Sequence, residues 1–227
     1  MYFYKKLIII TFIGTLLLLP SSCKKEDDNT PTTVTDIDGN VYNIITIGEQ
    51  VWMAENLKVT HYRNGDSVSH IIDDVQWVNS VSGAYCNYNN NEIAYTNIFG
   101  RLYNWYSLTD SRNIAPKGWH LPSDEEWAIL ITFLGGEAVA GDKLKEVGSN
   151  LWIDESSTNE SGFTALPGGS RGDNGIFEDF GDAGYWWSTT EHSSTDAFGR
   201  GMYYFYSGVA RGYRNKNAGF SVRCVRD

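Results

Sequence analysis

An apolar run near the N-terminus determines which part of this chain can fold and in which compartment it does so. Two lysines precede the uncharged stretch 7–19, and together they have the form of a basic n-region followed by an h-region. The stretch is shorter than the roughly 18 to 20 residues that a membrane-spanning helix needs. Two small serines then lead directly to Cys23. The sequence therefore predicts a cleaved signal peptide over residues 1–22 and export of the rest of the chain.

The residues that end on Cys23 resemble the lipobox of bacterial lipoproteins, in which the cysteine is acylated and becomes the new N-terminus. Pro20 departs from the aliphatic residue usual at that place. The alternative is ordinary cleavage, which leaves Cys23 as a free extracellular thiol. The charged run 24–28 resembles the surface-export signal of Bacteroidetes lipoproteins, and its alternative is a solvated tether. We expect a lipid-anchored outer-membrane protein exposed at the cell surface, with the periplasmic face as the alternative.

One folded domain is expected over residues 35–227, after a flexible tether over residues 23–34 that is polar and lacks apolar periodicity. The length after the tether lies within the range of a single domain, and no repeat is visible. The chain has 28 acidic against 18 basic residues. This balance does not fit the Lys and Arg clusters that bind phosphates, so nucleic acid is not an expected partner.

Two helices are expected in the first part of the domain. Residues 121–127 read Leu-Pro-Ser-Asp-Glu-Glu-Trp, in which Ser123 and Glu126 can cap each other's backbone groups. Apolar residues at helical spacing follow as far as Leu134, and two glycines then end the helix. An apolar stripe at i, i+4, i+7 and i+8 predicts another helix over 98–106.

Strands are expected at both ends of the domain. Residues 41–47 and 51–53 flank a Gly-Glu-Gln turn, which predicts an N-terminal hairpin. After Lys145 the chain is rich in Gly, Ser, Asn and aromatic residues, and the clearest strands there are 186–190, 202–206 and 220–225. Two helices packed on small antiparallel sheets, with long Gly- and Trp-rich loops, describe an α+β fold.

Two cysteines, Cys86 and Cys224, lie within the predicted domain. Alternation along the last strand places Cys224 on the inward face with Phe220 and Val222. Because the expected compartment is oxidising, we expect a disulfide between Cys86 and Cys224 that ties the first half of the domain to its last strand. The alternative is a pair of buried free thiols.

Several separated phrases of the sequence carry a family resemblance. They occur at 48–57 (GEQVWMAENL), 100–106 (GRLYNWY), 118–122 (GWHLP), 162–169 (GFTALPGG), 185–188 (YWWS) and 219–226 (GFSVRCVR). Together they resemble the Fibrobacter succinogenes major paralogous domain family, which is found widely in Bacteroidetes surface and secreted proteins. The resemblance spans nearly the whole predicted domain. It implies localisation and architecture, and it carries no established activity.

The later phrases also resemble formylglycine-generating enzymes and C-type-lectin-like folds. The shared features are a Leu-Pro-Ser-x-x-Glu-Trp helix start, a Trp-rich strand and a terminal Gly-Phe-x-x-Arg strand. The resemblance implies a C-type-lectin-like fold. The enzyme chemistry requires two closely spaced reactive cysteines, whereas Cys86 and Cys224 are far apart in sequence. The Glu-Pro-Asn and Gln-Pro-Asp phrases of the calcium-dependent sugar site do not occur, so sugar binding of that kind is not expected.

Metal ligands are sparse in the sequence. The four histidines show no helical pairing and no flanking cysteine, so a zinc site is not indicated. Asp173, Asn174, Asp179 and Asp182 lie in a glycine-rich stretch and are candidate oxygen ligands for calcium. The alternative is an acidic loop that is simply solvated. No other cofactor is expected.

Aromatic and polar residues near the end of the domain form the candidate ligand surface. The aromatic residues of 202–206 alternate between two faces, and both faces cannot easily be buried in a thin sheet. Tyr and Arg side chains stack on sugars and anchor protein partners. The predicted contact residues are Tyr204, Tyr206, Arg211, Tyr213 and Arg214. The alternative is that the tyrosines cover the core and the arginines are solvated.

Two classes of function follow from these residues. The preferred hypothesis is a surface module, tethered to the membrane through its lipid anchor, that binds or adheres to glycan or protein without catalysis. The rival is an enzyme, hydrolytic in character, whose site shows no recognisable motif. A structural component of the envelope is the third possibility.

Overall fold

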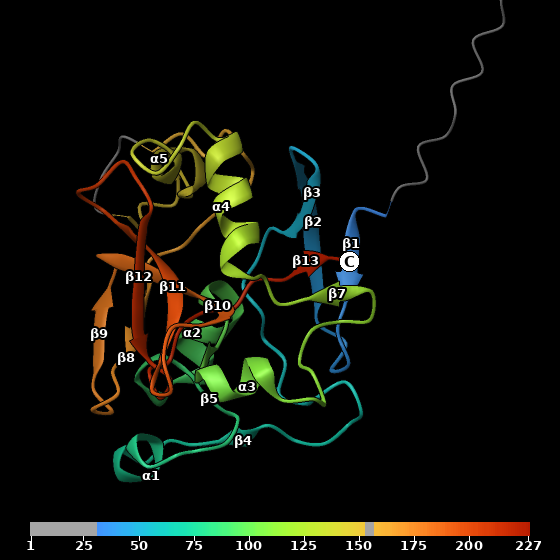
Figure 1. Cartoon of the computed structure of the whole chain (residues 1–227), viewed down its shortest axis with the longest axis vertical. Coiled ribbons are helices and arrows are strands. Elements are labelled where there is room, and N and C mark those ends of the chain that lie inside the picture. The colour runs from blue at the N-terminus through green and yellow to red at the C-terminus, as the bar shows by residue number, and fades with distance from the viewer. Residues whose placement is uncertain (1–30, 153–156) are drawn as a thin grey trace, which may run out of the picture. The chain divides into compact units, whose positions relative to one another are not determined.

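The computed structural model describes residues 31–152 and 157–227, and Figure 1 shows their arrangement. The predicted signal peptide, Cys23 and the first residues of the predicted tether lie outside the described residues. The described residues form three β-sheets and a few short helices, which is an α+β architecture. No helix in this part of the chain is long and apolar enough to cross a membrane.

The first sheet brings the two ends of the domain together. Its order is β1 (Thr33–Thr35), β2 (Val41–Ile47), β3 (Gln50–Met53), β13 (Val225–Arg226) and β7 (Trp119–His120). The predicted hairpin is confirmed, because β2 and β3 pair from Ile44 opposite Met53 to Ile47 opposite Gln50. The last strand then pairs with β3 and β7. The chain therefore ends beside the strands with which its domain begins.

The second sheet carries most of the later half of the chain. Its order is β12 (Ala210–Asn215), β11 (Asp196–Tyr203), β10 (Ala183–Glu191), β8 (Gly168–Arg171) and β9 (Phe177–Phe180). All neighbours are antiparallel except β8 and β10, which run parallel. A third, small sheet contains β4 (Ser69–His70), β5 (Ala84–Cys86) and β6 (Leu102–Tyr103).

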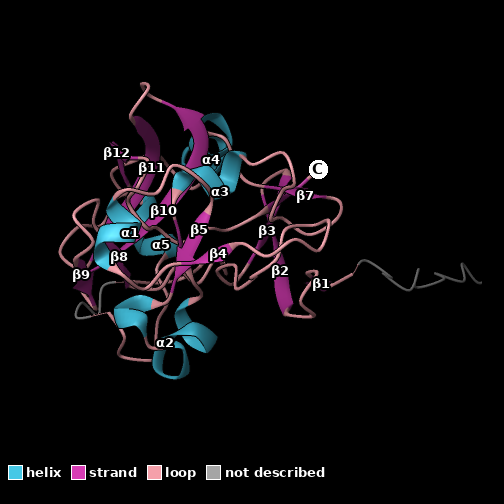
Figure 2. Ribbon diagram, turned by 90° about the horizontal axis from the view of Figure 1, so that it is seen from below, coloured by secondary structure: helices cyan, strands magenta, loops and turns pink. Residues whose placement is uncertain are grey.

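The helices are short and lie around the sheets (Figure 2). They are α1 (Asp74–Val78), the 3-10 turn η1 (Tyr88–Asn90), α2 (Glu92–Phe99), α3 (Trp105–Thr109), α4 (Asp124–Phe133) and α5 (Ala140–Leu144). The predicted capping box at the start of α4 is confirmed. The Glu126 amide donates to Ser123 Oγ at 3.2 Å, and the Ser123 amide donates to Glu126 Oε2 at 2.8 Å.

The predicted helix over 98–106 is wrong, because two local signals divide that segment. Gly100 has a φ of 78° and ends α2. The Asn104 side chain accepts a hydrogen bond from the Ser107 amide and begins α3 as its N-cap. Between them the chain is extended as β6, which pairs with β5. The apolar stripe therefore belongs to three separate elements.

The predicted strand over 202–206 is also wrong beyond Tyr203, where β11 ends. The Tyr204 amide still donates to the carbonyl of Asp182 at 2.9 Å, and the chain then turns, with the Tyr206 amide donating to the carbonyl of Tyr203 at 3.3 Å. The buried Lys145 holds this turn, because its Nζ donates to the carbonyls of Tyr203 and Tyr206 at 3.2 and 3.1 Å. Lys145, which is far away in the sequence, thus fixes the turn after Tyr203. The alternation of residues 202–206 does not indicate this turn.

The second sheet separates two hydrophobic clusters. Alternation along β10 directs Trp186 to one face and Trp187 to the other. On the α4 side, Trp52 lies 5.0 Å from Trp127 between ring centroids, and Phe163 lies 5.7 Å from both. Aromatic contacts at such spacings contribute about 0.5–1.5 kcal/mol each beyond the area that they bury. This three-ring contact joins β3, α4 and the chain before β8.

A buried polar cluster centred on Asn56 links segments far apart in the sequence. Asn56 Oδ1 accepts from Trp186 Nε1 at 2.9 Å and from Arg223 Nε and Nη2 at 3.1 and 2.7 Å. The Arg223 guanidinium also donates to the carbonyls of Phe163 and Thr164. Burial lowers the pKa of Arg223, and the charge of nearby Glu55 offsets part of that effect. The residues of this Asn56 cluster come from four of the six family phrases.

The predicted disulfide between Cys86 and Cys224 is wrong, since both residues are free and buried. They pack in different hydrophobic clusters: Cys86 lies with Trp77 and Leu102, and Cys224 lies in the larger cluster on the Trp187 side. Burial raises the pKa of the Cys86 thiol to about 12 and also raises that of Cys224. Thiols that stay protonated behave as small apolar side chains and react slowly.

Candidate functional site

Three glycines leave a hollow on one face of the second sheet. Gly199 and Gly201 lie on β11, and Gly212 of β12 pairs with Gly199. Alternation places all three on the same face. Because they carry no side chains, a hollow of about 230 Å³ opens above the two strands. A Cβ on Gly212 would meet no heavy atom within 4 Å, so this position faces open space.

Aromatic rings form the wall of this hollow. Tyr185 of β10 stacks on Phe220 at 5.1 Å between centroids and meets Tyr203 edge-on at 5.8 Å. Beyond these rings, Phe220 packs on Trp187 at 4.4 Å, and Tyr203 lies 5.6 Å from Phe205. The five side chains form an aromatic row that runs from the core to the surface, where Phe205 is 72% exposed.

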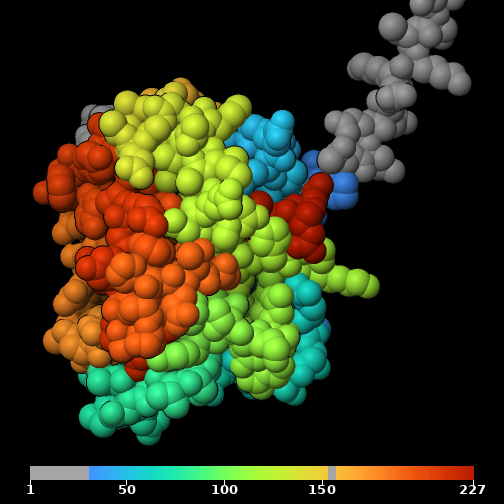
Figure 3. Space-filling model, viewed as in Figure 1, coloured from blue at the N-terminus to red at the C-terminus, as the bar shows by residue number. Residues whose placement is uncertain are grey.

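A second hollow of about 170 Å³ adjoins the first on the side of β9. Tyr185, Arg214 and Phe220 line both hollows, so the two adjoin. The second hollow is polar, and its carboxylate and amide side chains are Asp173, Asn174, Glu178, Asp179 and Asn215. Together the two hollows form one surface, termed the sheet groove, across β12, β11, β10, β8 and β9. Figure 3 shows the orange to red segments that carry β9 to β12 side by side on the left of the molecule.

Asp179, which lines the polar hollow, has an unusual backbone conformation. Its φ of 62° lies in the left-handed region, which costs a residue other than glycine on the order of 1 kcal/mol and recurs at ligand sites. The Tyr185 hydroxyl donates to Asp179 Oδ2 at 2.6 Å. Burial and this hydrogen bond raise the pKa of Tyr185, so its phenol stays protonated. A donor and an acceptor are thus held together where the two hollows meet.

Arg214 supplies the positive charge of the groove. Within the residues that the structure describes, its guanidinium donates only to the carbonyl of Tyr213, at 3.0 Å, and no carboxylate lies within ion-pair distance. A guanidinium has five N–H donors, so most of those of Arg214 are open to a ligand.

The structure distributes the predicted ligand residues over two faces of the sheet. Arg214 lies in the groove and Arg211 borders it. The Arg211 guanidinium, however, pairs with Asp124 of α4 at 2.9 Å, on the side away from the groove. Tyr213 shares that side and stacks on His192 at 4.0 Å between centroids.

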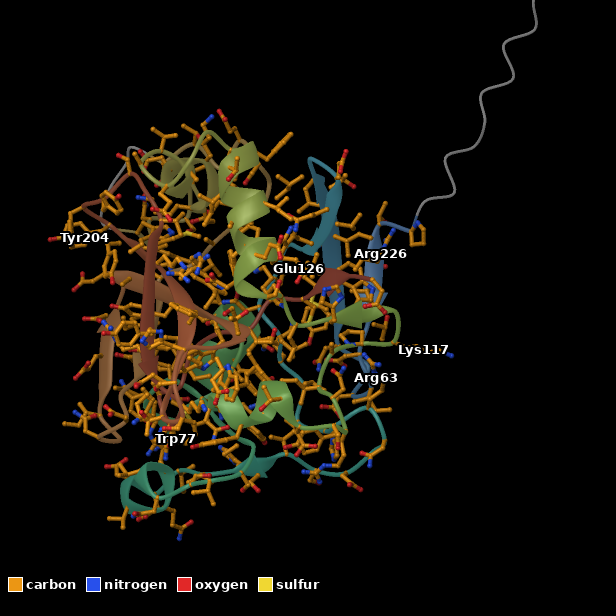
Figure 4. All side chains as sticks on the ribbon, in the orientation of Figure 1. Arg63, Trp77, Lys117, Glu126, Tyr204 and Arg226 are labelled. Atoms are coloured by element: carbon orange, nitrogen blue, oxygen red, sulfur yellow. The ribbon has the colours of Figure 1, made fainter. Side chains whose placement is uncertain are left out.

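The other two predicted ligand residues, Tyr204 and Tyr206, lie in the loop between β11 and β12. Figure 4 shows Tyr204 at the outer left edge of the molecule. Tyr206 is 39% exposed there. Sequence reasoning missed Tyr185, Asp179 and the glycines as groove residues, because the pairing of the strands brings them together.

The calcium candidates do not converge. Asp173 and Asp179 line the polar hollow, where Arg214 adds a positive charge. Asp182 lies in the turn before β10, and its amide donates to the carbonyl of Asp179 at 3.1 Å. Over residues 31–152 and 157–227, no group of three His, Cys, Asp or Glu side chains is placed to hold a metal ion.

Ser170 also lines the polar hollow, and it stands in a Gly-x-Ser-x-Gly phrase at 168–172. In hydrolases that use this motif, the serine lies at a sharp turn between a strand and a helix. Here Ser170 lies inside β8 and pairs with Glu178 of β9. No histidine is among the residues that line the groove. The motif therefore lacks both the turn and the base that nucleophilic catalysis requires.

His120 forms a separate polar cluster where the first sheet meets α4. Its Nε2 lies 2.6 Å from Glu126 Oε1 and its Nδ1 lies 2.8 Å from Asp227 Oδ1. Figure 4 shows Glu126 at the start of α4, close to Arg226 of β13. Burial opposes charge on the imidazole, but the two hydrogen bonds outweigh it and raise the pKa of His120. The cluster fastens the end of the chain to the start of α4.

A His120→Gln variant is expected to lose stability in a pH-dependent manner. The folded-state pKa of His120 lies above its usual value of about 6.5, so the stabilisation is complete below that pH and is lost as the pH rises through the folded-state pKa. Urea unfolding should show a difference between wild type and variant that is larger at pH 6 than at pH 9, by roughly 0.5 kcal/mol for such a partly exposed pair.

His70→Gln provides the control for this prediction, because burial lowers the pKa of His70. The pH dependence should therefore run in the opposite direction, so that the contribution of His70 to stability grows as the pH rises. An effect of His120→Gln that is the same at both pH values would contradict the prediction that charged His120 stabilises the fold through Glu126 and Asp227.

Comparison with known proteins identifies the family. The model of the Fibrobacter succinogenes major domain matches residues 45–226, and the chain belongs to this family. No curated protein and no solved structure gives a significant match. The match covers the first hairpin from Ile45 of β2 onward, the Asn56 cluster and the whole sheet groove.

Proposed function

We propose that this chain is a lipid-anchored surface module with a C-type-lectin-like fold that binds glycan in the sheet groove. The observation that carries the proposal is the composition of the groove, where apolar rings, a phenol, carboxylates, amides and an open guanidinium border one glycine floor. Sugars present an apolar ring face together with hydroxyl groups that both donate and accept hydrogen bonds. Such a ligand matches rings that stack and polar groups that converge.

The placement of three sequence phrases supports the C-type-lectin-like part of the proposal. The Leu-Pro-Ser-x-x-Glu-Trp phrase begins α4 with a capping box. The Trp-rich phrase forms the centre of β10. The terminal Gly-Phe-x-x-Arg phrase supplies Phe220 to the groove and Arg223 to the Asn56 cluster. The three phrases thus hold the two sheets and α4 together.

The signal-peptide and lipobox pattern supports the anchored, surface-exposed part of the proposal. The groove lies on the second sheet, while β1, which follows the predicted tether, lies in the first sheet. Figure 1 shows these two sheets on opposite sides of α4. A ligand in the groove therefore binds on a different sheet from the one that the predicted tether enters.

Gly212→Leu is expected to abolish glycan binding while leaving the fold intact. The new side chain enters the open space above the groove floor, and the backbone φ at Gly212 does not require glycine. Binding of the full-length protein in detergent should be measured on an array of plant, bacterial and mucin glycans, with the melting temperature measured in parallel. We expect at least a tenfold loss of affinity for every glycan that wild type binds, with a stability change of about 0.5 kcal/mol or less.

Tyr213→Ala is the matched control, because it removes a ring of the same strand from the opposite face. It should bind glycans as wild type does. Equal binding by wild type and Gly212→Leu would place the site elsewhere. Release of shortened sugars during the assay would instead favour a hydrolytic enzyme.

A further inference from the structure

The sheet groove is open at both ends. At one end the aromatic row passes from Tyr203 to Phe205, which projects into solvent with 72% of its surface exposed. At the other end the polar hollow reaches Asp173 and Glu178, which are also exposed. The two ends lie far apart across the sheet, since Phe205 lies in the loop that joins β11 to β12 and Glu178 lies on the edge strand β9. Neither end is closed by a wall that would stop a chain of sugar units.

The chemistry of the groove changes along its length. One end offers the Tyr203 ring with Phe205 just beyond the lining, the centre offers the glycine floor with Tyr185 and Arg214, and the far end offers carboxylates and amides. Because Tyr185 and Arg214 line both hollows, a ligand that fills one hollow extends directly into the other. A single sugar would leave one hollow and the exposed ring of Phe205 unused.

From this geometry, and resting on the proposed function, we infer that the ligand is a linear oligosaccharide bound along its chain rather than at its terminal unit. Its units span three subsites, namely the Phe205 ring, the glycine floor and the carboxylate end. The exposed Phe205 ring is then a stacking platform for the outermost unit. A hydroxyl or carboxylate oxygen of the central unit accepts hydrogen bonds from Arg214, and hydroxyl groups at the far end donate to Glu178 and Asp179.

The dependence of affinity on chain length tests this inference. The probes are oligosaccharides of two to six units, one series each of β-1,4-linked glucose, xylose and mannose and one of α-1,4-linked galacturonate. Isothermal titration with the full-length protein in detergent gives the affinities. In the series that binds, the hexamer should bind about tenfold more tightly than the dimer. Phe205→Ala should remove most of that gain and leave the affinity for the dimer unchanged.

Phe133→Ala is the matched control, because Phe133 is also a largely exposed phenylalanine, at 63%, but lies on α4 away from the groove. It should retain the full dependence on chain length. Equal affinity for dimer and hexamer, or an equal effect of Phe205→Ala on both, overturns the extended-chain inference while glycan binding stands. Failure of wild type to bind any of the four series while it binds a glycan on the array overturns this inference alone, and failure to bind any glycan on the array overturns the proposed function as well.

Discussion

Arg223→Ala is expected to lower the free energy of unfolding by about 3–4 kcal/mol, the largest effect of any single arginine in the domain. The guanidinium is fully buried and donates to Asn56 Oδ1 and to the carbonyls of Phe163 and Thr164. Its removal leaves buried acceptors without donors, and each such group costs about 1–3 kcal/mol. It also removes the cation that lies 4.1 Å from the Phe163 ring centroid.

Urea unfolding followed by tryptophan fluorescence measures this loss. Arg214→Ala is the matched control, since its guanidinium is exposed in the groove, and it should change stability by about 0.5 kcal/mol or less. Asn56→Ala should be as harmful as Arg223→Ala, and the double variant should lose clearly less than the sum of the two, because both act on one network. Additive effects would show that the cluster does not act as a unit.

Arg171→Ala is expected to release α1 from the body of the domain and to lower the free energy of unfolding by about 3 kcal/mol. Arg171 is fully buried and donates to the carbonyls of Ile71 and Ile72 at 2.8 and 3.0 Å. Its guanidinium also pairs with Asp74 at 2.5 Å and lies 4.6 Å from the Trp77 ring centroid. One side chain of β8 thus holds the start of the segment around α1, while Asn217 Nδ2 donates to the carbonyls of Val78 and Ser80 at its end.

Hydrogen exchange resolves this effect along the chain. Protection should fall most in residues 71–79 and much less in α4 of the same variant. Arg112→Ala is the control: Arg112 pairs with Asp66 and Asp110 at the surface, and its loss should change stability far less than the loss of Arg171. A uniform fall in protection across the domain would contradict a local anchoring role for Arg171.

The elements that could be predicted from sequence are those whose signals are local. Ser123 and Glu126 lie three residues apart and specify the start of α4 without help from the rest of the chain. The β2–β3 hairpin is similarly specified by its turn. The helix predicted over 98–106 failed because helical spacing of apolar residues arises by chance in short segments, and the capping by Gly100 and Asn104 carried more weight.

The candidate site was harder to predict because it depends on register. Tyr213 and Arg214 are neighbours in sequence, yet the pairing of β12 with β11 directs them to opposite faces. The floor of the groove is formed by glycines, which carry no side chains. A glycine in a sequence does not indicate whether a hollow lies above it. Cys86 and Cys224 illustrate the same limit, since composition gives the number of thiols but not the distance between them.

The family phrases now have a physical explanation in the Asn56 cluster. Asn56, Phe163, Trp186 and Arg223 come from four separate phrases and meet in one buried network. These phrases therefore meet where the two sheets join. Arg214 and Phe205 of the proposed site lie outside the phrases. Ligand choice can thus change while the framework stays the same.

The return of β13 to a place between β3 and β7 has a mechanical consequence for a tethered adhesive protein. In the proposed anchored glycan-binding protein, drag on a captured polymer would enter the domain through the second sheet, and the membrane would resist through β1 in the first sheet. Force between the two sheets would pass through the contact of Trp52, Trp127 and Phe163 and through the hydrogen bonds of the buried Arg223. These many short-range contacts would share the force. Pulling would therefore not peel the C-terminal strand away first, because that strand is clamped on both sides.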